Sequence, residues 1–223
     1  IAEYQLTANV WVRALLEDEF GVKPSEIIWV RGGMDRPVRP EKLPLELPND
    51  IKIQAAGNEN TLNQMLLDGE IDGLIGPRAP KCFFEPGSKI KRLFDNSIDV
   101  GLEYFERTKI FPIMHVLGIR KRLWEEHPFL SQALCKAFIT AKDIAEGELA
   151  DTSATKVTMP FVEDHLDAIK EIMGNNFWSY GLDFFNRNAL EVFLKHHYNQ
   201  GLSKRELKVN DLFAPNSIET YSF

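Results

Sequence analysis

Short apolar runs separated by helical patterns mark the first third of the chain. Residues 8–20 are predicted to form a helix, with Thr7 as the N-cap and Gly21 as the left-handed residue that ends it. A second helix is expected over residues 62–66. Helices that alternate with strands indicate the α/β class and a mostly parallel sheet. Three apolar runs predict the strands, at residues 27–30, 51–55 and 71–75.

The most apolar run of the chain covers residues 110–119, and its lack of alternation predicts a strand that is buried on both faces. His115 is the one polar side chain in this run. Such a histidine is either a hydrogen-bonded core residue or a cleft residue whose near-neutral pKa suits proton transfer. Further along, apolar residues at helical spacing predict helices over 128–148 and 160–173 and another that starts at Asn186.

The composition is that of an ordinary globular protein, with 44% hydrophobic and 26% charged residues among 223. No apolar run approaches the roughly eighteen residues of a membrane span. A net charge of −7 with scattered basic residues argues against nucleic-acid binding. Cys82 and Cys135 lack ligand spacing, and the adjacent His196 and His197 diverge around a helix. We therefore expect no metal site.

The start of the first predicted helix is a candidate anion site. Free backbone N–H groups at a helix N-terminus favour anions, and Tyr4, Gln5 and Thr7 add polar groups there. These residues are therefore candidates for binding a carboxylate. The alternative is an ordinary capped helix without a ligand.

Arg78 is the second candidate for carboxylate binding. It lies between Pro77 and Pro80, directly after the third predicted strand. Ligands in open α/β sheets bind beyond the carboxyl ends of the strands, and a guanidinium suits bidentate contact with a carboxylate. The alternative is a surface arginine that pairs with an acidic neighbour.

Seven short segments follow one another along the chain in a characteristic order and spacing: EYQLTA at 3–8, WVR at 11–13, DGEID at 68–72, RAP at 78–80, IFPIMH at 110–115, GLSKR at 201–205 and LFAP at 212–215. Together they resemble the 4,5-dihydroxyphthalate decarboxylase family from one end of the chain to the other. The resemblance implies a type II periplasmic-binding-protein-like α/β fold, with two lobes and a central cleft. Family members carry a further N-terminal segment, so the first lobe is expected to be incomplete in this chain.

In that fold, residues 1–79 correspond to the second lobe, residues 80–119 to a crossing segment and return strand, and residues 120–223 to a helical remainder on the first lobe. This topology leads us to expect that the candidate residues converge from both lobes. The substrate-binding candidates are Tyr4, Gln5, Thr7 and Arg78, and the catalytic candidate is His115.

The function implied by the resemblance is cofactor-independent decarboxylation of an aromatic dicarboxylic acid, with 4,5-dihydroxyphthalate converted to protocatechuate and carbon dioxide. The alternative is a solute-binding protein of an ABC-type transporter, or a sensor domain, for an aromatic acid or a pyrimidine-like ligand. Both predict a small aromatic carboxylate as partner and leave a homo-oligomer open. The enzyme is expected in the cytoplasm, the binding protein in the periplasm.

Overall fold

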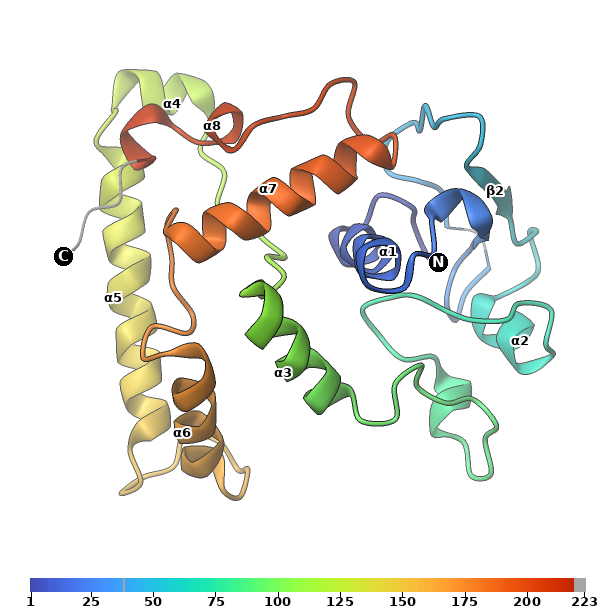
Figure 1. Cartoon of the computed structure of the whole chain (residues 1–223), viewed down its shortest axis with the longest axis horizontal. Coiled ribbons are helices and arrows are strands. Elements are labelled where there is room, and N and C mark those ends of the chain that lie inside the picture. The colour runs from blue at the N-terminus through green and yellow to red at the C-terminus, as the bar shows by residue number, and fades with distance from the viewer. Residues whose placement is uncertain (38, 219–223) are drawn as a thin grey trace. The chain divides into compact units, whose positions relative to one another are not determined.

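The computed structural model describes residues 1–37 and 39–218, and it has the predicted α/β character (Figure 1). Short 3-10 turns lie at Pro24–Glu26, Lys81–Phe84 and Pro215–Ser217. The two strands are β1 (Ile28–Arg31) and β2 (Lys52–Ala55). The helices are α1 (Thr7–Phe20), α2 (Leu62–Leu67), α3 (Ser97–Thr108), α4 (Lys121–Glu126), α5 (Leu130–Ala150), α6 (Val162–Met173), α7 (Phe184–Asn199) and α8 (Val209–Leu212).

The chain folds into two compact units. Unit 1 contains residues 1–97 and 191–207, and unit 2 contains residues 98–190 and the described residues from 208 onward. Helix α7 begins in unit 2 and ends in unit 1. None of the helices in the described part of the chain is long and apolar enough to cross a membrane.

The sheet of unit 1 consists of β1 and β2, which run parallel with Ile28 opposite Lys52. These are the first two predicted strands. The third predicted strand is wrong, because residues 71–75 have no regular structure. Gly73 interrupts this run without a side chain to pack, and glycine weakens a strand interior. Ile71 instead joins a hydrophobic cluster.

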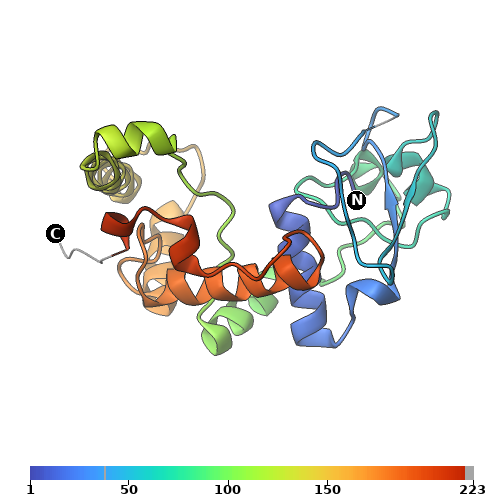
Figure 2. The same ribbon diagram turned by 90° about the horizontal axis from the view of Figure 1, so that it is seen from above.

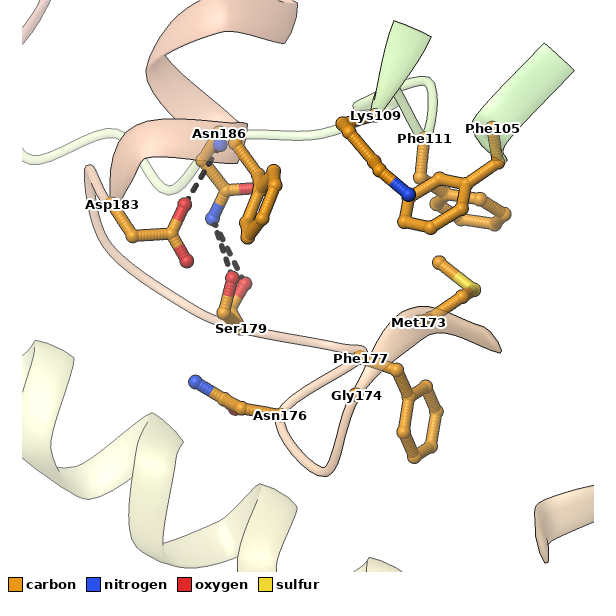
Figure 3. A pocket seen from close by; sticks show the side chains of 11 residues that line it. Phe105, Lys109, Phe111, Met173, Gly174, Asn176, Phe177, Ser179, Asp183 and Asn186 are labelled. Atoms are coloured by element: carbon orange, nitrogen blue, oxygen red, sulfur yellow. Dashed lines mark hydrogen bonds between the residues drawn. The ribbon is translucent and has the colours of Figure 1, made fainter. Parts of the chain in front are cut away.

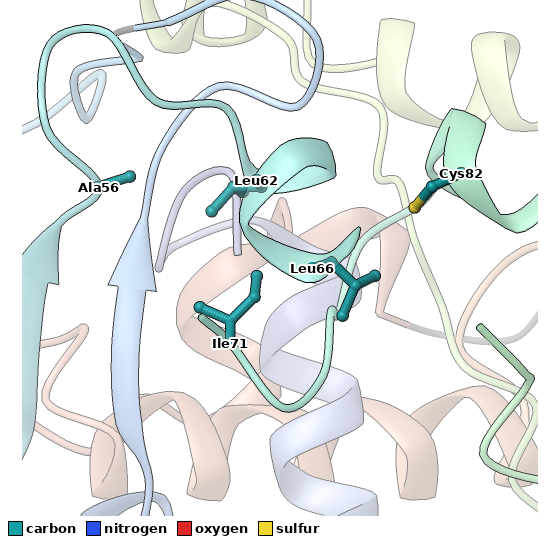
Figure 4. Close-up of a cluster of buried hydrophobic side chains, with 5 residues drawn as sticks. All are labelled: Ala56, Leu62, Leu66, Ile71 and Cys82. Carbon is teal, nitrogen blue, oxygen red and sulfur yellow. The ribbon is translucent and has the colours of Figure 1, made fainter. Parts of the chain in front are cut away.

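That cluster forms the core around α2 (Figure 4). Thr61 caps the helix, since its hydroxyl accepts a hydrogen bond from the backbone N–H of Gln64 at 3.2 Å. The capped helix turns one apolar face inward, while its other face stays in solvent. The buried members of the cluster are Ala56, Leu62, Leu66, Ile71 and Cys82.

Helix α1 begins one residue earlier than predicted. Its N-cap is Leu6, whose carbonyl accepts from the Val10 N–H at 3.0 Å, so the prediction of Thr7 as N-cap is wrong. The incoming chain is tied to the helix by another side chain, since the amide of Asn9 donates to the Glu3 carbonyl at 2.7 Å. Gly21 ends the helix with φ 70°, as predicted.

Unit 2 is largely helical. Helices α5 and α6 lie side by side, and α4 crosses the start of α5 at a steep angle (Figures 1 and 2). Asn216 holds the chain end against these helices, because its side-chain oxygen accepts hydrogen bonds from Trp124 at 3.2 Å and Ser131 at 2.7 Å.

The predicted strand at residues 110–119 is wrong. This segment has no regular structure, and His115, Val116 and Leu117 are exposed rather than buried. A strand needs a partner for its backbone groups, and no strand occurs among the described residues of unit 2. Pro112 also removes one donor that a central strand would use.

Candidate functional site

The residues just before α1 bind a carboxylate that belongs to the chain itself. Glu41 accepts a hydrogen bond from the backbone N–H of Tyr4 at 2.6 Å and another from the side-chain amide of Gln5 at 3.0 Å. Thr7 follows as the first residue of the helix and is half-buried. Two of the predicted residues therefore contact a carboxylate, and Tyr4 does so through its backbone rather than its phenol.

Glu41 reaches this position on the proline-rich segment, residues 34–50. Its described residues, 34–37 and 39–50, have no helix or strand, as the prolines favour, and side-chain contacts hold them in place. Nε of Arg39 donates to the buried carboxylate of Glu3 at 2.7 Å. The carbonyl of Arg39 in turn accepts a hydrogen bond from Arg31 at the end of β1.

A buried arginine supports the same end of α1. Arg13 is 1% exposed; its Nε donates to Gln200 Oε1 at 2.7 Å and its Nη2 to the Tyr4 carbonyl at 2.7 Å. The guanidinium carbon lies 3.8 Å from the centre of the Tyr4 ring. Burial lowers the pKa of Arg13 to about 10, while Tyr4 and Glu41 oppose that shift.

Sequence reasoning did not select Arg13 or Glu41. The available signal for Arg13 was its place on the buried face of α1, four residues after Asn9, because two polar side chains at this spacing share one face. Glu41 carried no signal, since nothing local in a proline-rich segment shows where its side chains dock.

The phenol of Tyr4 is inaccessible. Its side chain is fully buried, and its ring packs edge-on against Trp29 at 6.1 Å. Burial raises the pKa of the Tyr4 hydroxyl above 10, although Arg13 partly offsets the rise and Asp50 adds to it. Within the described chain the hydroxyl oxygen has no hydrogen-bond partner.

Arg78 and His115 both lie in irregular, exposed segments. Arg78 belongs to unit 1 and follows Ile75, which packs against the cluster that contains Tyr4 and Trp29. His115 belongs to unit 2. Tyr4, Gln5 and Thr7 are neighbours in sequence at and just before the start of α1, and the site roles of all five candidates, Arg78 and His115 included, remain proposals.

The adjacent histidines near the end of α7 face different surroundings. His196 is buried, with Nε2 2.7 Å from Asp18 Oδ2 and Nδ1 3.5 Å from Glu17 Oε2. The ring of His197 lies 5.8 Å from that of Phe193. Across the described residues, no group of three or more histidine, cysteine or acidic side chains is arranged to hold a metal ion.

Unit 2 contains a cavity of about 270 Å³ that sequence reasoning missed (Figure 3). It is formed by the end of α3, the residues after it, the turn that follows α6 and the start of α7. Four of its eleven lining residues are phenylalanines. The lining residues are Phe105, Lys109, Phe111, Met173, Gly174, Asn176, Phe177, Ser179, Asp183, Phe185 and Asn186.

The fold and the α1 site together define an α/β protein that holds a carboxylate on backbone and amide donors. No model of a known protein family matches the chain. It is 50% identical over 221 residues to the 4,5-dihydroxyphthalate decarboxylase of Comamonas testosteroni. The matched region covers 99% of this chain and 67% of that protein. A 4,5-dihydroxyphthalate decarboxylase of Pseudomonas putida is 49% identical over 94 residues, or 42% of this chain and 36% of that protein. The chain belongs to the 4,5-dihydroxyphthalate decarboxylase family.

His197 is expected to make folding sensitive to acid. Burial lowers the pKa of its imidazole below 6.5, and the charge of Arg13 lowers it further. The unfolded chain therefore binds the proton first, so the contribution to the free energy of unfolding is complete above pH 6.5 and declines as the pH falls below it. We expect His197→Phe to flatten this decline in urea unfolding measured from pH 7 to about pH 5.

The matched control for this measurement is His165→Phe, because His165 is exposed on α6. It is expected to keep the slope of the unmodified chain. An unchanged slope in His197→Phe would show that other groups cause the acid sensitivity.

Proposed function

We propose that the protein is a carboxy-lyase that removes one carboxylate from an aromatic dicarboxylic acid without a cofactor, converting 4,5-dihydroxyphthalate to protocatechuate and carbon dioxide. The observation that carries this proposal is 50% identity over 99% of the chain to a decarboxylase of that name. The carboxylate-binding start of α1 agrees with an acidic substrate. The two free cysteines suit a reducing compartment, and we place the reaction in the cytoplasm.

The proposed arrangement is the two-lobed fold of type II periplasmic binding proteins, with residues 1–79 in the second lobe, 80–119 as the crossing segment and 120–223 on the first lobe. Two features support it. Residues 1–79 fall within one compact unit and residues 120–190 within the other, whereas residues 191–207 belong to the unit of residues 1–79. The parallel pairing of β1 and β2 is also what an α/β lobe requires.

The direct test is incubation of the protein with 4,5-dihydroxyphthalate. We expect release of carbon dioxide and formation of protocatechuate (3,4-dihydroxybenzoate). Chromatography measures the amount of this product. The unheated protein is compared with the heat-denatured protein to exclude spontaneous loss of carbon dioxide. Tight binding of the diacid without any product would overturn the proposal and favour a solute-binding role.

The chemistry sets three requirements. A proton must be added to the ring carbon that bears the departing carboxylate, while the hydroxyl para to it donates electrons into the ring. The bond between this carbon and the carboxylate then breaks, its electron pair restores the aromatic ring, and carbon dioxide leaves. The protein must anchor the carboxylate that stays, exclude water from the one that leaves, and supply the proton.

We assign the anchor to Tyr4, Gln5 and Thr7 at the start of α1, together with Arg78. The position of Glu41 supports this assignment, because its carboxylate uses the Tyr4 N–H and the Gln5 amide as a substrate carboxylate would. The positive end of the helix dipole and the buried charge of Arg13 favour an anion at the same place. In this assignment the substrate carboxylate displaces Glu41.

Glu41→Gln tests the displacement. The neutral amide is a weaker competitor for the two donors, since hydrogen bonds to ionised groups are roughly twice as strong as those between neutral groups. We expect the affinity for phthalate, a diacid without the activating hydroxyls, to rise by about fivefold, as for a competitor weakened by roughly 1 kcal/mol. Isothermal titration calorimetry measures it.

The matched control is Glu46→Gln. Glu46 lies on the same proline-rich segment, and its ion pair with Lys204 at 3.8 Å is exposed on both sides. This variant loses the same charge and is expected to bind phthalate as the unmodified protein does. Weaker binding by Glu41→Gln would instead make Glu41 part of the binding surface.

We assign the proton donor to His115. An imidazole titrates near neutrality, and general acid catalysis contributes roughly 10²–10⁴ in rate. His115→Asn is therefore expected to keep the affinity for phthalate and to lose at least about a hundredfold in kcat. His165→Asn removes another exposed histidine of unit 2 and should leave kcat unchanged. If turnover persists in His115→Asn with the same pH profile, the proton comes from another group.

A further inference from the structure

The cavity of unit 2 has the size and lining of a site for an aromatic ring. Its volume is about 270 Å³. A cavity of roughly 150 Å³ between apolar side chains is enough to hold benzene. Phe105 and Phe111 come from one side of the cavity, while Met173 and Phe177 lie opposite them (Figure 3).

One cation faces this aromatic wall. The ammonium group of Lys109 lies 5.4 Å from the centre of the Phe105 ring. Lys109 has φ 57°, a left-handed conformation that is uncommon for residues other than glycine. Its backbone N–H closes the end of α3 by donating to the Phe105 carbonyl at 2.7 Å, so the side chain leaves the helix at a fixed point.

The charge of Lys109 has no carboxylate partner within 4.0 Å among the described residues. The other side of the cavity carries the carboxylate of Asp183 (Figure 3). Asp183 Oδ1 accepts from the Asn186 N–H at 2.8 Å, and the Asn186 amide donates to the Ser179 carbonyl at 3.1 Å. A ligand that enters the cavity therefore meets apolar rings, the ammonium group of Lys109 and the carboxylate of Asp183.

We propose that this cavity binds a monocyclic aromatic carboxylate, with the ring between Phe111 and Phe177 and the carboxylate on Nζ of Lys109. The choice of an aromatic acid over other apolar anions rests on the proposed function. Ring hydroxyls of such an acid would have Asp183 as an acceptor within the same lining. None of these residues is among those assigned above to the carboxylate anchor or to proton donation.

The test measures binding rather than turnover, so it is independent of whether the protein decarboxylates anything. The probes are 3,4-dihydroxybenzoate, benzoate and the uncharged benzyl alcohol, titrated calorimetrically into the full chain. We expect both acids to bind more tightly than benzyl alcohol. Lys109→Met should weaken both acids about tenfold or more, with benzyl alcohol unaffected, whereas Lys109→Arg should retain acid binding.

The control for lost charge is Lys121→Met, because Lys121 is exposed on α4 and pairs only across one helical turn with Glu125. It should bind all three probes as the unmodified chain does. Phe177→Leu keeps the charge but removes the ring contact, and is expected to weaken the acids and benzyl alcohol alike.

Several results would overturn the proposal. These are equal affinity for benzoate and benzyl alcohol, no detectable binding of either acid, or the same acid affinity in Lys109→Met and Lys121→Met. If Lys109→Met loses turnover together with acid binding, the cavity holds the substrate during reaction. If it keeps turnover while acid binding falls, the cavity is a separate aromatic-acid site, and either result supports the proposal.

Discussion

Unit 1 and the residues that bind Glu41 depend on the hydrogen bonds made by the buried guanidinium of Arg13. It joins the middle of α1 to the chain before that helix, through the Tyr4 carbonyl, and to Gln200, 187 residues away in sequence. Gln200 returns a hydrogen bond to the Val10 carbonyl at 3.1 Å. Burying this charge carries a desolvation cost, which is offset only because these acceptors and the Tyr4 ring surround it.

The surroundings explain why Glu41 binds just before α1. The Asn9 amide holds the Glu3 carbonyl, and with it the peptide that carries the Tyr4 N–H, so this N–H points at a defined place. The nearby positive charge of Arg13 favours an anion there. Glu41 fills this place with the chain's own carboxylate. A donor set that is preorganised for an internal carboxylate is also suited to an external one, and this links the fold of unit 1 to the proposed chemistry.

The two proposed sites would recognise an aromatic acid in different ways. In the anchor proposed for unit 1, backbone and amide donors beside a helix start would select the ligand through hydrogen-bond direction. In the site proposed for unit 2, aromatic rings would supply contact area and Lys109 a single point charge. Lysine places fewer directional demands than a fixed set of donors, so the proposed site would suit aromatic acids that differ in their ring substituents.

The sequence alone determined the features that depend on near neighbours. It determined the α/β class, the two paired strands, the left-handed end of α1 at Gly21 and, through ordered short motifs, the family. From local properties, the helix dipole and the residues beside it, the sequence also predicts the start of α1 as a place for a substrate carboxylate, and that role stays a prediction.

The tertiary structure decided everything that needed a distant partner. The runs at 71–75 and 110–119 have strand-like composition, but a strand forms only where another strand pairs with its backbone, and composition does not supply that partner. The bond between Glu41 and Tyr4 spans 37 residues, and the cavity around Lys109 is built from three separate stretches of chain. The local sequence fixes which chemical groups a residue carries. The packing of remote segments fixes which other groups these contact.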